Sequence, residues 1–218
     1  MIKDYKTIYE GGTGEIIEKK SRFIASIAHV ESEEEAVAFV EQIRKKYWDA
    51  RHNCSAYIIG KRQEIMRCSD DGEPAQTAGK PMLDVLSGQG LCDLVAVVTR
   101  YFGGTLLGTG GLVRAYSKAV QEGLKNSVII EKHLADKMMI ITDYNGIGKI
   151  QYLMAQESFT PMNTEYTDVV TITVPVPVDQ TEGFQAKITQ VTNGKAKMEC
   201  ECQLYYGIIE KEVILFQE

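Results

Sequence analysis

The chain has 218 residues, of which 44% are hydrophobic and 25% are charged, and these proportions are those of an ordinary folded globular protein. They exclude collagen-like, coiled-coil and disordered chains, because enough apolar surface is present to offset the chain entropy lost on folding. No apolar run approaches the ~20 residues of a membrane helix and no signal peptide is evident, so we expect a cytoplasmic protein with no membrane segment.

The net charge of −6 is unevenly distributed along the chain. Residues 1–130 carry 17 basic and 17 acidic side chains, whereas residues 131–218 carry 7 basic and 13 acidic ones. The first part can therefore present a basic face, which the second part as a whole cannot do. The five cysteines contain no CxxC pair and are expected to be reduced, as in a cytoplasmic protein.

The first half of the chain is predicted to mix strands and helices. Residues 15–19 and 21–30 are expected to be strands, and a capping box at Ser32 and Glu35 predicts a helix with apolar positions up to Tyr47. Hairpin strands at 54–59 and 65–68 precede a polar loop over 69–77. A short helix over 81–86, a buried strand over 94–99 and a helix over 111–124 follow.

The second half has a different order of predicted elements. It comprises a strand over 134–142, a helix over 146–158, strands over 160–166 and 168–175, a helix over 179–192 and a strand over 195–206. This β-α-β-β-α-β order is that of a ferredoxin-like fold. We therefore expect an α+β protein of two domains, residues 1–130 and 131–218.

The most informative motif is a glycine-rich segment that leads from the buried strand into the last helix of the first domain. Glycine allows positive φ and close approach of the backbone, and the amides at a helix start favour an anion such as phosphate. We expect a phosphate-binding face here; its predicted residues are Arg100, Tyr101, Gly103, Gly104, Thr105, Gly108, Gly110, Gly111, Arg114 and Lys118. The alternative is that the glycines only allow a tight turn and close helix–sheet packing.

A second cluster joins His52 to Asp70, Asp71 and Glu73. These side chains could hold Mg²⁺ or perform acid–base catalysis. The alternative carries more weight, because Asp-Gly and Glu-Pro are typical of turns and aspartates cap backbone amides. We therefore assign no metal, no cofactor and no catalytic residue, and lean against an enzyme.

Other chemically suggestive residues have simpler explanations. Cys54 is expected to be a buried, inert thiol rather than a nucleophile paired with His52. Tyr101 is the best candidate to stack on a base, whereas Tyr47 and Phe102 are expected in the core.

Five segments taken together resemble the YigZ/IMPACT family. They are His52–Tyr57, Asp70–Pro74, Thr77–Leu83, Arg100–Gly104 and Leu107–Tyr116. The resemblance implies an N-terminal domain like the second domain of the fifth small-subunit ribosomal protein, and a C-terminal ferredoxin-like domain similar to domains of elongation factor G. One departure is Gln76, where the family usually has glycine, and it bears on the path of the Asp71–Thr77 loop.

One function of the eukaryotic members is not expected of this chain. Eukaryotic IMPACT proteins restrain a starvation-sensing kinase and carry an additional N-terminal RWD domain, which we expect this bacterial-type chain to lack. We therefore do not transfer the kinase role. For bacterial members the folds suggest nucleic-acid or ribosome binding.

The leading hypothesis is a translation-associated protein that binds RNA or a ribonucleoprotein through the glycine-loop face. A metal-dependent hydrolase of a phosphoester, with His52, Asp70, Asp71 and Glu73 around the ion, is the first alternative. The second is a protein-interaction regulator of translation that docks a partner on its acidic C-terminal domain.

Overall fold

The computed structural model describes residues 2–210 and 212–216, which form a mixed α+β structure. The chain divides into a first unit, Tyr5–Ile130, and a second unit that begins at Glu131 and includes the residues before Tyr5. No helix in the described part of the chain is long and apolar enough to cross a membrane.

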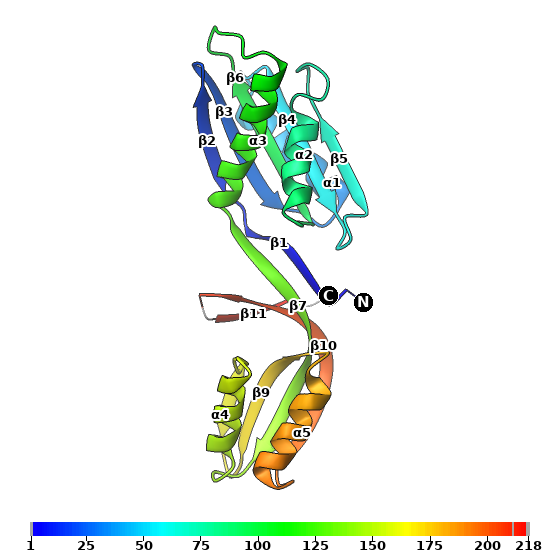
Figure 1. The fold of residues 1–218 in the computed structure, drawn as a ribbon, viewed down its shortest axis with the longest axis vertical. Coiled ribbons are helices and arrows are strands. Elements are labelled where there is room, and N and C mark those ends of the chain that lie inside the picture. Colours follow the sequence, from blue (N-terminus) through cyan, green and yellow to red (C-terminus); the bar gives the residue numbers. More distant parts are fainter. Residues whose placement is uncertain (1, 211, 217–218) are drawn as a thin grey trace. The chain divides into compact units, whose positions relative to one another are not determined.

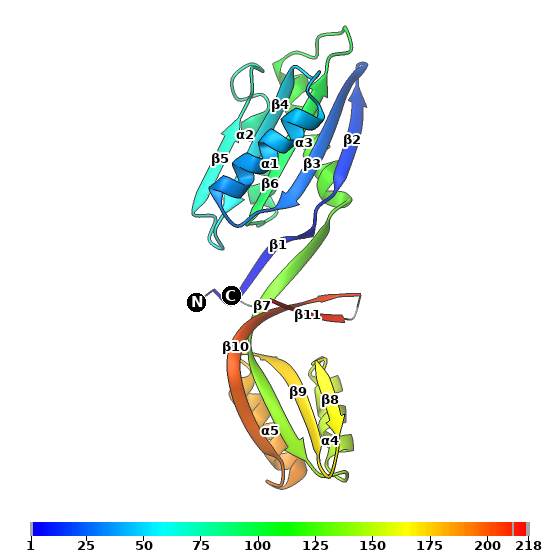
Figure 2. The same ribbon diagram turned by 180° about the vertical axis from the view of Figure 1, so that it is seen from behind.

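The first unit is built on a five-stranded sheet in which all neighbouring strands are antiparallel. The order is β2 (Thr13–Glu18), β3 (Ser21–His29), β6 (Leu94–Tyr101), β4 (His52–Ile59) and β5 (Ile65–Ser69). Helix α1 (Glu33–Lys46) covers one face, and α2 (Gly79–Gly88) and α3 (Thr109–Lys125) cover the other (Figures 1 and 2). The central strand β6 is therefore buried on both faces along 94–100, as its continuous apolar run predicts.

Local signals fix the helices of this unit. The Ser32 side chain accepts the Glu35 amide, and the Glu35 carboxylate accepts the Glu31 amide at 2.7 Å, so the predicted cap of α1 is confirmed. Acidic residues fill the first turn of α1 and basic residues its last turn, in the arrangement that the helix dipole favours. Helix α3 buries a stripe that includes Leu112, Tyr116 and Val120.

The second unit has the predicted ferredoxin-like order. Strands β10 (Lys197–Ile209), β7 (Val128–Thr142), β9 (Val170–Pro177) and β8 (Asn163–Tyr166) lie side by side, with α4 (Ile147–Gln156) and α5 (Thr181–Thr192) on one face. Between sheet and helices lies a core that contains Met138, Ile140, Ile172 and Phe184. Helix α5 ends at Asn193, which has a φ of 52°, as the Asn-Gly signal predicts.

Two strands were not predicted. Strand β1 (Asp4–Glu10) pairs with β7, and β11 (Glu212–Phe216) pairs with β10. The partner of β1 is more than a hundred residues away, so no local pattern announces the pairing. The turn before β11 places Glu210 at a φ of 50°, a conformation for which glycine or asparagine is the usual signal.

Candidate anion-binding site

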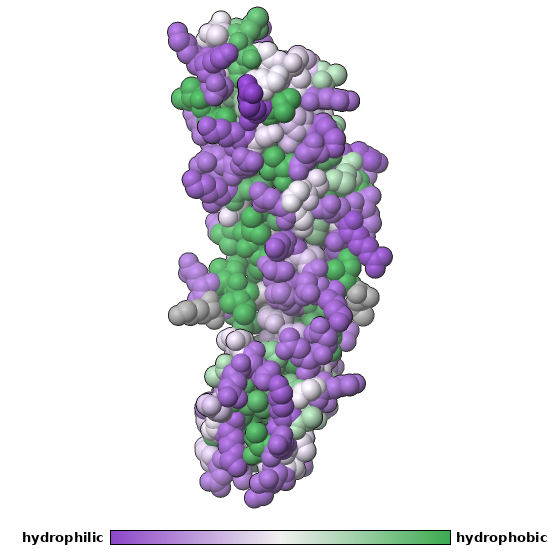
Figure 3. Space-filling model, in the orientation of Figure 1, coloured by the Kyte–Doolittle hydropathy of each residue, from purple (hydrophilic) through white to green (hydrophobic). Residues whose placement is uncertain are grey.

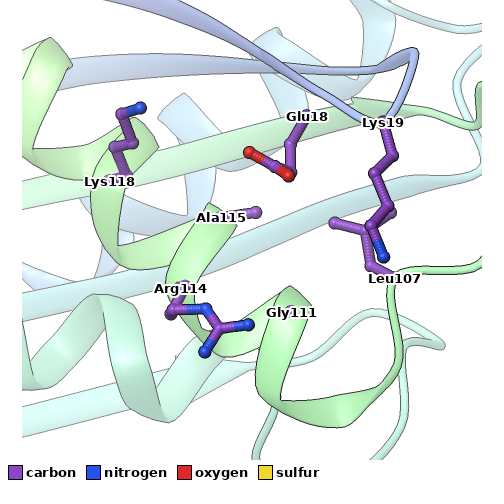
Figure 4. Close-up of a pocket in the computed structure, with 7 residues that line it drawn as sticks. All are labelled: Glu18, Lys19, Leu107, Gly111, Arg114, Ala115 and Lys118. Carbon is purple, nitrogen blue, oxygen red and sulfur yellow. The ribbon is translucent and has the colours of Figure 1, made fainter.

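A pocket of about 260 Å³ lies in the first unit, between the end of β2 and the first turns of α3. Figure 4 shows its lining: Arg114 and Lys118 project from α3, Glu18 and Lys19 come from the end of β2, and Leu107 precedes the helix. Gly111 and Ala115 form its floor on the helix side. Three of these side chains are basic and one is acidic, so the pocket has a net positive charge.

The pocket rim includes a β2–β3 turn that sequence analysis did not single out. Lys19 and Lys20 occupy the turn with φ angles of 45° and 67°. Such a two-residue turn normally takes Asn-Gly, because both central residues have positive φ. Lysines in it are strained by about 1 kcal/mol or more each and project two ammonium groups into solvent. The sequence does contain a signal for this pair: both lysines stand at the end of a predicted strand, where typical turn residues are expected.

Gly103 holds this turn against the loop after β6. A Cβ atom at Gly103 would collide with the backbone of Lys20, and the Gly103 amide donates to the Ser21 hydroxyl at 3.1 Å. Gly103 is therefore a packing residue. The close-packing interpretation of the glycine motif is correct at this position.

Three further glycines of the motif face open space, whereas a Cβ atom at Gly111 would lie 3.0 Å from Leu107 Cβ. Gly104 and Gly108 have φ angles of 84° and 74°, and Cβ atoms at Gly104, Gly108 or Gly110 would meet nothing within 4 Å. Gly110 thus has neither a strained backbone nor a crowded neighbour to explain it. Thr105, in the same loop, is exposed.

The start of α3 leaves its amides available. The N-cap Gly108 provides no side chain, and the amides of Thr109, Gly110 and Gly111 donate to no group within the described residues. The next amide, that of Leu112, closes the first helical bond to Gly108. Unpaired amides at a helix start carry partial positive charge and can donate hydrogen bonds to an anion.

The basic side chains beside these amides are also available. Arg114 and Lys118 are exposed one turn apart on α3, and neither forms an ion pair within the part of the chain that the structure describes. Among the described residues that line the pocket, Glu18 is the one acid. Of the predicted binding residues, the structure brings Gly111, Arg114 and Lys118 together in one pocket.

Arg100 was predicted as a phosphate ligand, and that prediction is wrong. Its side chain is buried and paired with the Glu73 carboxylate, with 2.5 Å between Nη1 and Oε1. The guanidinium carbon also lies 5.4 Å from the ring centroid of Phe23 and 5.6 Å from that of Phe102. A buried cation needs an internal partner, and Glu73, 27 residues earlier, supplies it.

The aromatic residues differ from expectation as well. Tyr101 is only partly exposed; its hydroxyl donates to Asp49 at 2.7 Å and Arg22 lies over its ring at 6.0 Å, so it offers a poor stacking surface. Phe102, expected in the core, is 53% exposed, whereas Tyr47 packs against the α1 core as predicted. Trp48 is 83% exposed.

Asp70 acts as a cap in the loop before α2. Its carboxylate accepts the amides of Gln76, Ala78 and Gly79 at 2.8 to 3.0 Å. Gln76 takes a φ of 62°, a conformation for which glycine is better suited. The loop therefore adopts this left-handed conformation despite the larger residue, and the capping interpretation of Asp70 is confirmed.

The other members of the acidic cluster are likewise engaged within the fold. Asp71 contacts Arg44 Nη2 at 2.7 Å and accepts the Asn53 amide at 2.6 Å, while His52 Nδ1 lies 2.9 Å from the Asp71 carbonyl. Glu73 accepts the Tyr116 hydroxyl at 2.8 Å in addition to Arg100. Among the described residues no three side chains are grouped to hold a metal ion. The arrangement does not support the hydrolase alternative.

Cys54 is buried beside this network, as predicted. Its thiol contacts the Tyr116 hydroxyl at 3.3 Å and the Asp70 carbonyl at 3.0 Å. Burial raises its pKa to about 12, so the thiol stays protonated at neutral pH. It is a structural residue.

The sequence matches two known domain models, and the structure resembles a solved one. Residues 19–124 match the model of the Impact N-terminal domain, and residues 140–195 match a domain of unknown function, DUF1949. A solved structure described as a hypothetical protein is 36% identical, has a TM-score of 0.58, and is aligned over 92% of this chain and 98% of its own. The chain is thus a two-domain protein with an Impact-type first domain.

Relatives that align with most of the chain show to which family it belongs. The chain is 43% identical to the IMPACT family member YvyE of Bacillus subtilis over 98% of this chain and 97% of the relative. It is 40% identical to the IMPACT family member YigZ of Escherichia coli over 83% of this chain and 89% of the relative. The chain belongs to the IMPACT family.

Proposed function

We propose that this chain is a cytoplasmic, translation-associated protein that binds RNA or a ribonucleoprotein through phosphate contacts at the pocket between β2 and α3. The observation that carries the proposal is the meeting of three basic side chains, Lys19, Arg114 and Lys118, with unpaired amides at the start of α3. Charged side chains and helix-start amides are the groups with which proteins position a phosphate backbone.

The chemistry of the pocket favours a polyanion over an isolated small molecule. Its cations are exposed and mounted on two different elements, so they can meet successive phosphates rather than enclose one. Glu18 lowers the local positive charge but leaves it positive. Binding of this kind depends on release of counterions and weakens steeply as salt rises.

The translational setting is supported by the family. The resemblance links eukaryotic IMPACT proteins to translational control, and the folds implied for both domains resemble parts of the translation apparatus. The acidic second unit, with 7 basic and 13 acidic residues from 131 onward, is not expected to bind RNA and remains the candidate surface for a protein partner.

A double charge reversal tests the proposal. Arg114→Glu with Lys118→Glu is expected to abolish co-sedimentation with ribosomes and binding of labelled RNA at low salt, because two attractive contacts become repulsive. The matched control is Arg62→Glu with Lys125→Glu, which makes the same change in net charge on exposed residues. Arg62 lies between β4 and β5 and Lys125 ends α3, so both are at the end of the sheet opposite the pocket. The control variant is expected to bind like the parent protein.

The outcome separates the competing functions. Equal loss in both double variants means that only net charge matters and removes the pocket from the account. Unchanged binding in the Arg114/Lys118 variant refutes the proposed site. A metal-dependent phosphoesterase activity that Asp71→Asn abolishes would favour the hydrolase instead.

A further inference from the structure

The most exposed large hydrophobic side chain in the described part of the first unit is Trp48, at 83%. It is also the single tryptophan of the chain. An indole exposed to this extent leaves a large, flat apolar face free to contact a ligand. Trp48 lies in the turn after α1, which the Ala50 amide closes onto the Tyr47 carbonyl at 3.0 Å.

Basic side chains surround this turn. Lys45 and Lys46 end α1, and Arg51 follows the turn. Lys45 and Arg51 are exposed and form no ion pair within the described residues, whereas Arg44 is engaged by Glu41 and Asp71. Trp48 is thus an exposed aromatic ring flanked by available cations.

The Trp48 turn lies at the same end of the first unit as the anion-binding pocket. Strand pairing fixes this, because the start of β3 pairs with the end of β6 at Arg22 and Tyr101, and the start of β4 pairs there at His52 and Arg100. The β2–β3 turn, the loop after β6 and the end of α1 therefore share one end of the sheet (Figures 1 and 2).

A chain of side-chain contacts connects the two places. Arg22, two residues after the Lys20 turn, lies over the Tyr101 ring, and the Tyr101 hydroxyl donates to Asp49, the neighbour of Trp48. The acids along this path are already engaged, since Glu15 accepts Arg22 at 2.7 Å and Asp49 accepts Tyr101. Arg22 thereby neutralises Glu15, whereas Asp49 keeps its negative charge because Tyr101 is a neutral donor. Asp49 is outnumbered by the exposed cations Lys45 and Arg51, so the end of the unit stays favourable for a polyanion.

Further apolar surface is exposed at this end. Phe102 is 53% and Leu106 is 82% exposed, both in the loop that leads to α3. In Figure 3, hydrophobic patches interrupt the hydrophilic surface at the end of the unit that carries this loop. Aromatic rings interleaved with cations are the combination that binds unpaired nucleotides, whose bases stack on the rings while the phosphates meet the cations.

From these observations we propose that this end of the first unit binds single-stranded RNA, with Trp48 as a base-stacking platform. The inference rests on the proposed function and adds to it the conformation of the nucleic acid. Duplex RNA keeps its bases stacked inside the helix, so an exposed indole gains nothing from it. Single strands present free base faces to Trp48 while Arg114, Lys118 and the β2–β3 lysines hold the backbone.

The single tryptophan makes the test direct. Trp48 emission is recorded while a 12-nucleotide single-stranded RNA without self-pairing is added, and binding is measured separately from the anisotropy of a fluorescein on the RNA. We expect emission to be quenched with the same saturation curve as the anisotropy. A 12-base-pair RNA duplex is expected to bind through its phosphates without quenching.

Variants then separate stacking from folding. Trp48→Ala is expected to weaken single-strand binding roughly tenfold or more, Trp48→Phe to retain most of it, and neither to change duplex binding. Val37→Ala removes another exposed apolar side chain, 52% exposed on α1, and is expected to leave both affinities unchanged. Circular dichroism melting curves of all variants confirm that they fold.

The outcomes distinguish a failure of the Trp48 stacking inference from a failure of the proposed RNA-binding function. If single strands bind and Arg114→Glu with Lys118→Glu abolishes that binding, but Trp48 is neither quenched nor needed, the stacking inference is overturned and the proposed function stands. If no RNA binds, both fail. If Trp48 is needed for ribosome co-sedimentation but free RNA does not quench it, the ring contacts a protein and the inference is overturned.

Discussion

Removal of Glu73 from the buried ion pair is expected to destabilise the first unit strongly. The Arg100 and Glu73 side chains are 7% and 3% exposed, and Glu73 also accepts the Tyr116 hydroxyl. Glu73→Ala leaves the Arg100 guanidinium buried without an anion, a change that typically lowers the free energy of unfolding by about 3–5 kcal/mol. The loop over 69–77 loses an anchor to the sheet at the same time.

A variant that removes both partners of the ion pair tests whether the uncompensated charge causes the loss of stability. Glu73→Ala with Arg100→Ala removes both charges, so it is expected to be no less stable than Glu73→Ala alone, although it deletes more atoms. The exposed pair of Lys80 and Asp84, at 56% and 57% side-chain exposure, is the control, and Lys80→Ala is expected to change stability by less than about 1 kcal/mol.

Urea unfolding followed by circular dichroism is a suitable assay, because Trp48 is 83% exposed in the folded protein and its emission would change little on unfolding. At a slope of about 2 kcal/mol per molar urea, the expected loss lowers the midpoint by roughly 2 M. A change in Glu73→Ala of under about 1 kcal/mol would mean that the ion pair does not hold the loop, and would refute this reasoning.

Three further predictions follow from single residues. Gly110→Ala is expected to stabilise the protein by up to about 1 kcal/mol in thermal melts, because its Cβ meets no protein atom. It is also expected to weaken RNA binding, because the added methyl group stands among the helix-start amides proposed to bind phosphate. Gly103→Ala, which collides with Lys20, should destabilise the protein instead. Gln76→Gly relieves a positive φ and is expected to raise the free energy of unfolding by roughly 1 kcal/mol; a loss of stability would contradict this. Cys54, with its pKa raised to about 12 by burial, is only about one ten-thousandth thiolate at pH 8, so a thiol reagent should leave it unmodified until urea unfolds the unit.

Elements with strong local signals could be predicted from sequence. The α1 cap at Ser32, the buried run of β6 and the Asn193 helix stop each depend on neighbouring residues, and the structure confirms all three. Strand β11 could not be predicted in this way, because its turn is formed by Glu210 rather than by a typical turn residue.

The residues of the site likewise fall into those that local sequence predicts and those that depend on tertiary packing. Arg114 and Lys118 are on one face of one helix, so sequence spacing alone placed them together. The burial of Arg100 depends on Glu73 in a distant loop, and the role of Lys19 depends on how a hairpin turn meets α3. Neither relation can be deduced from local sequence, since both arise from tertiary packing.

The salt dependence of RNA binding tests the central claim most directly. The logarithm of the binding constant is measured against the logarithm of salt concentration for the parent chain and for the neutral variant Arg114→Ala with Lys118→Ala, which weakens binding without reversing the charge. The account predicts a slope shallower by about 1.4 in the double variant, since two single-strand phosphate contacts are lost at about 0.7 each. Identical slopes and affinities for the two proteins would contradict it.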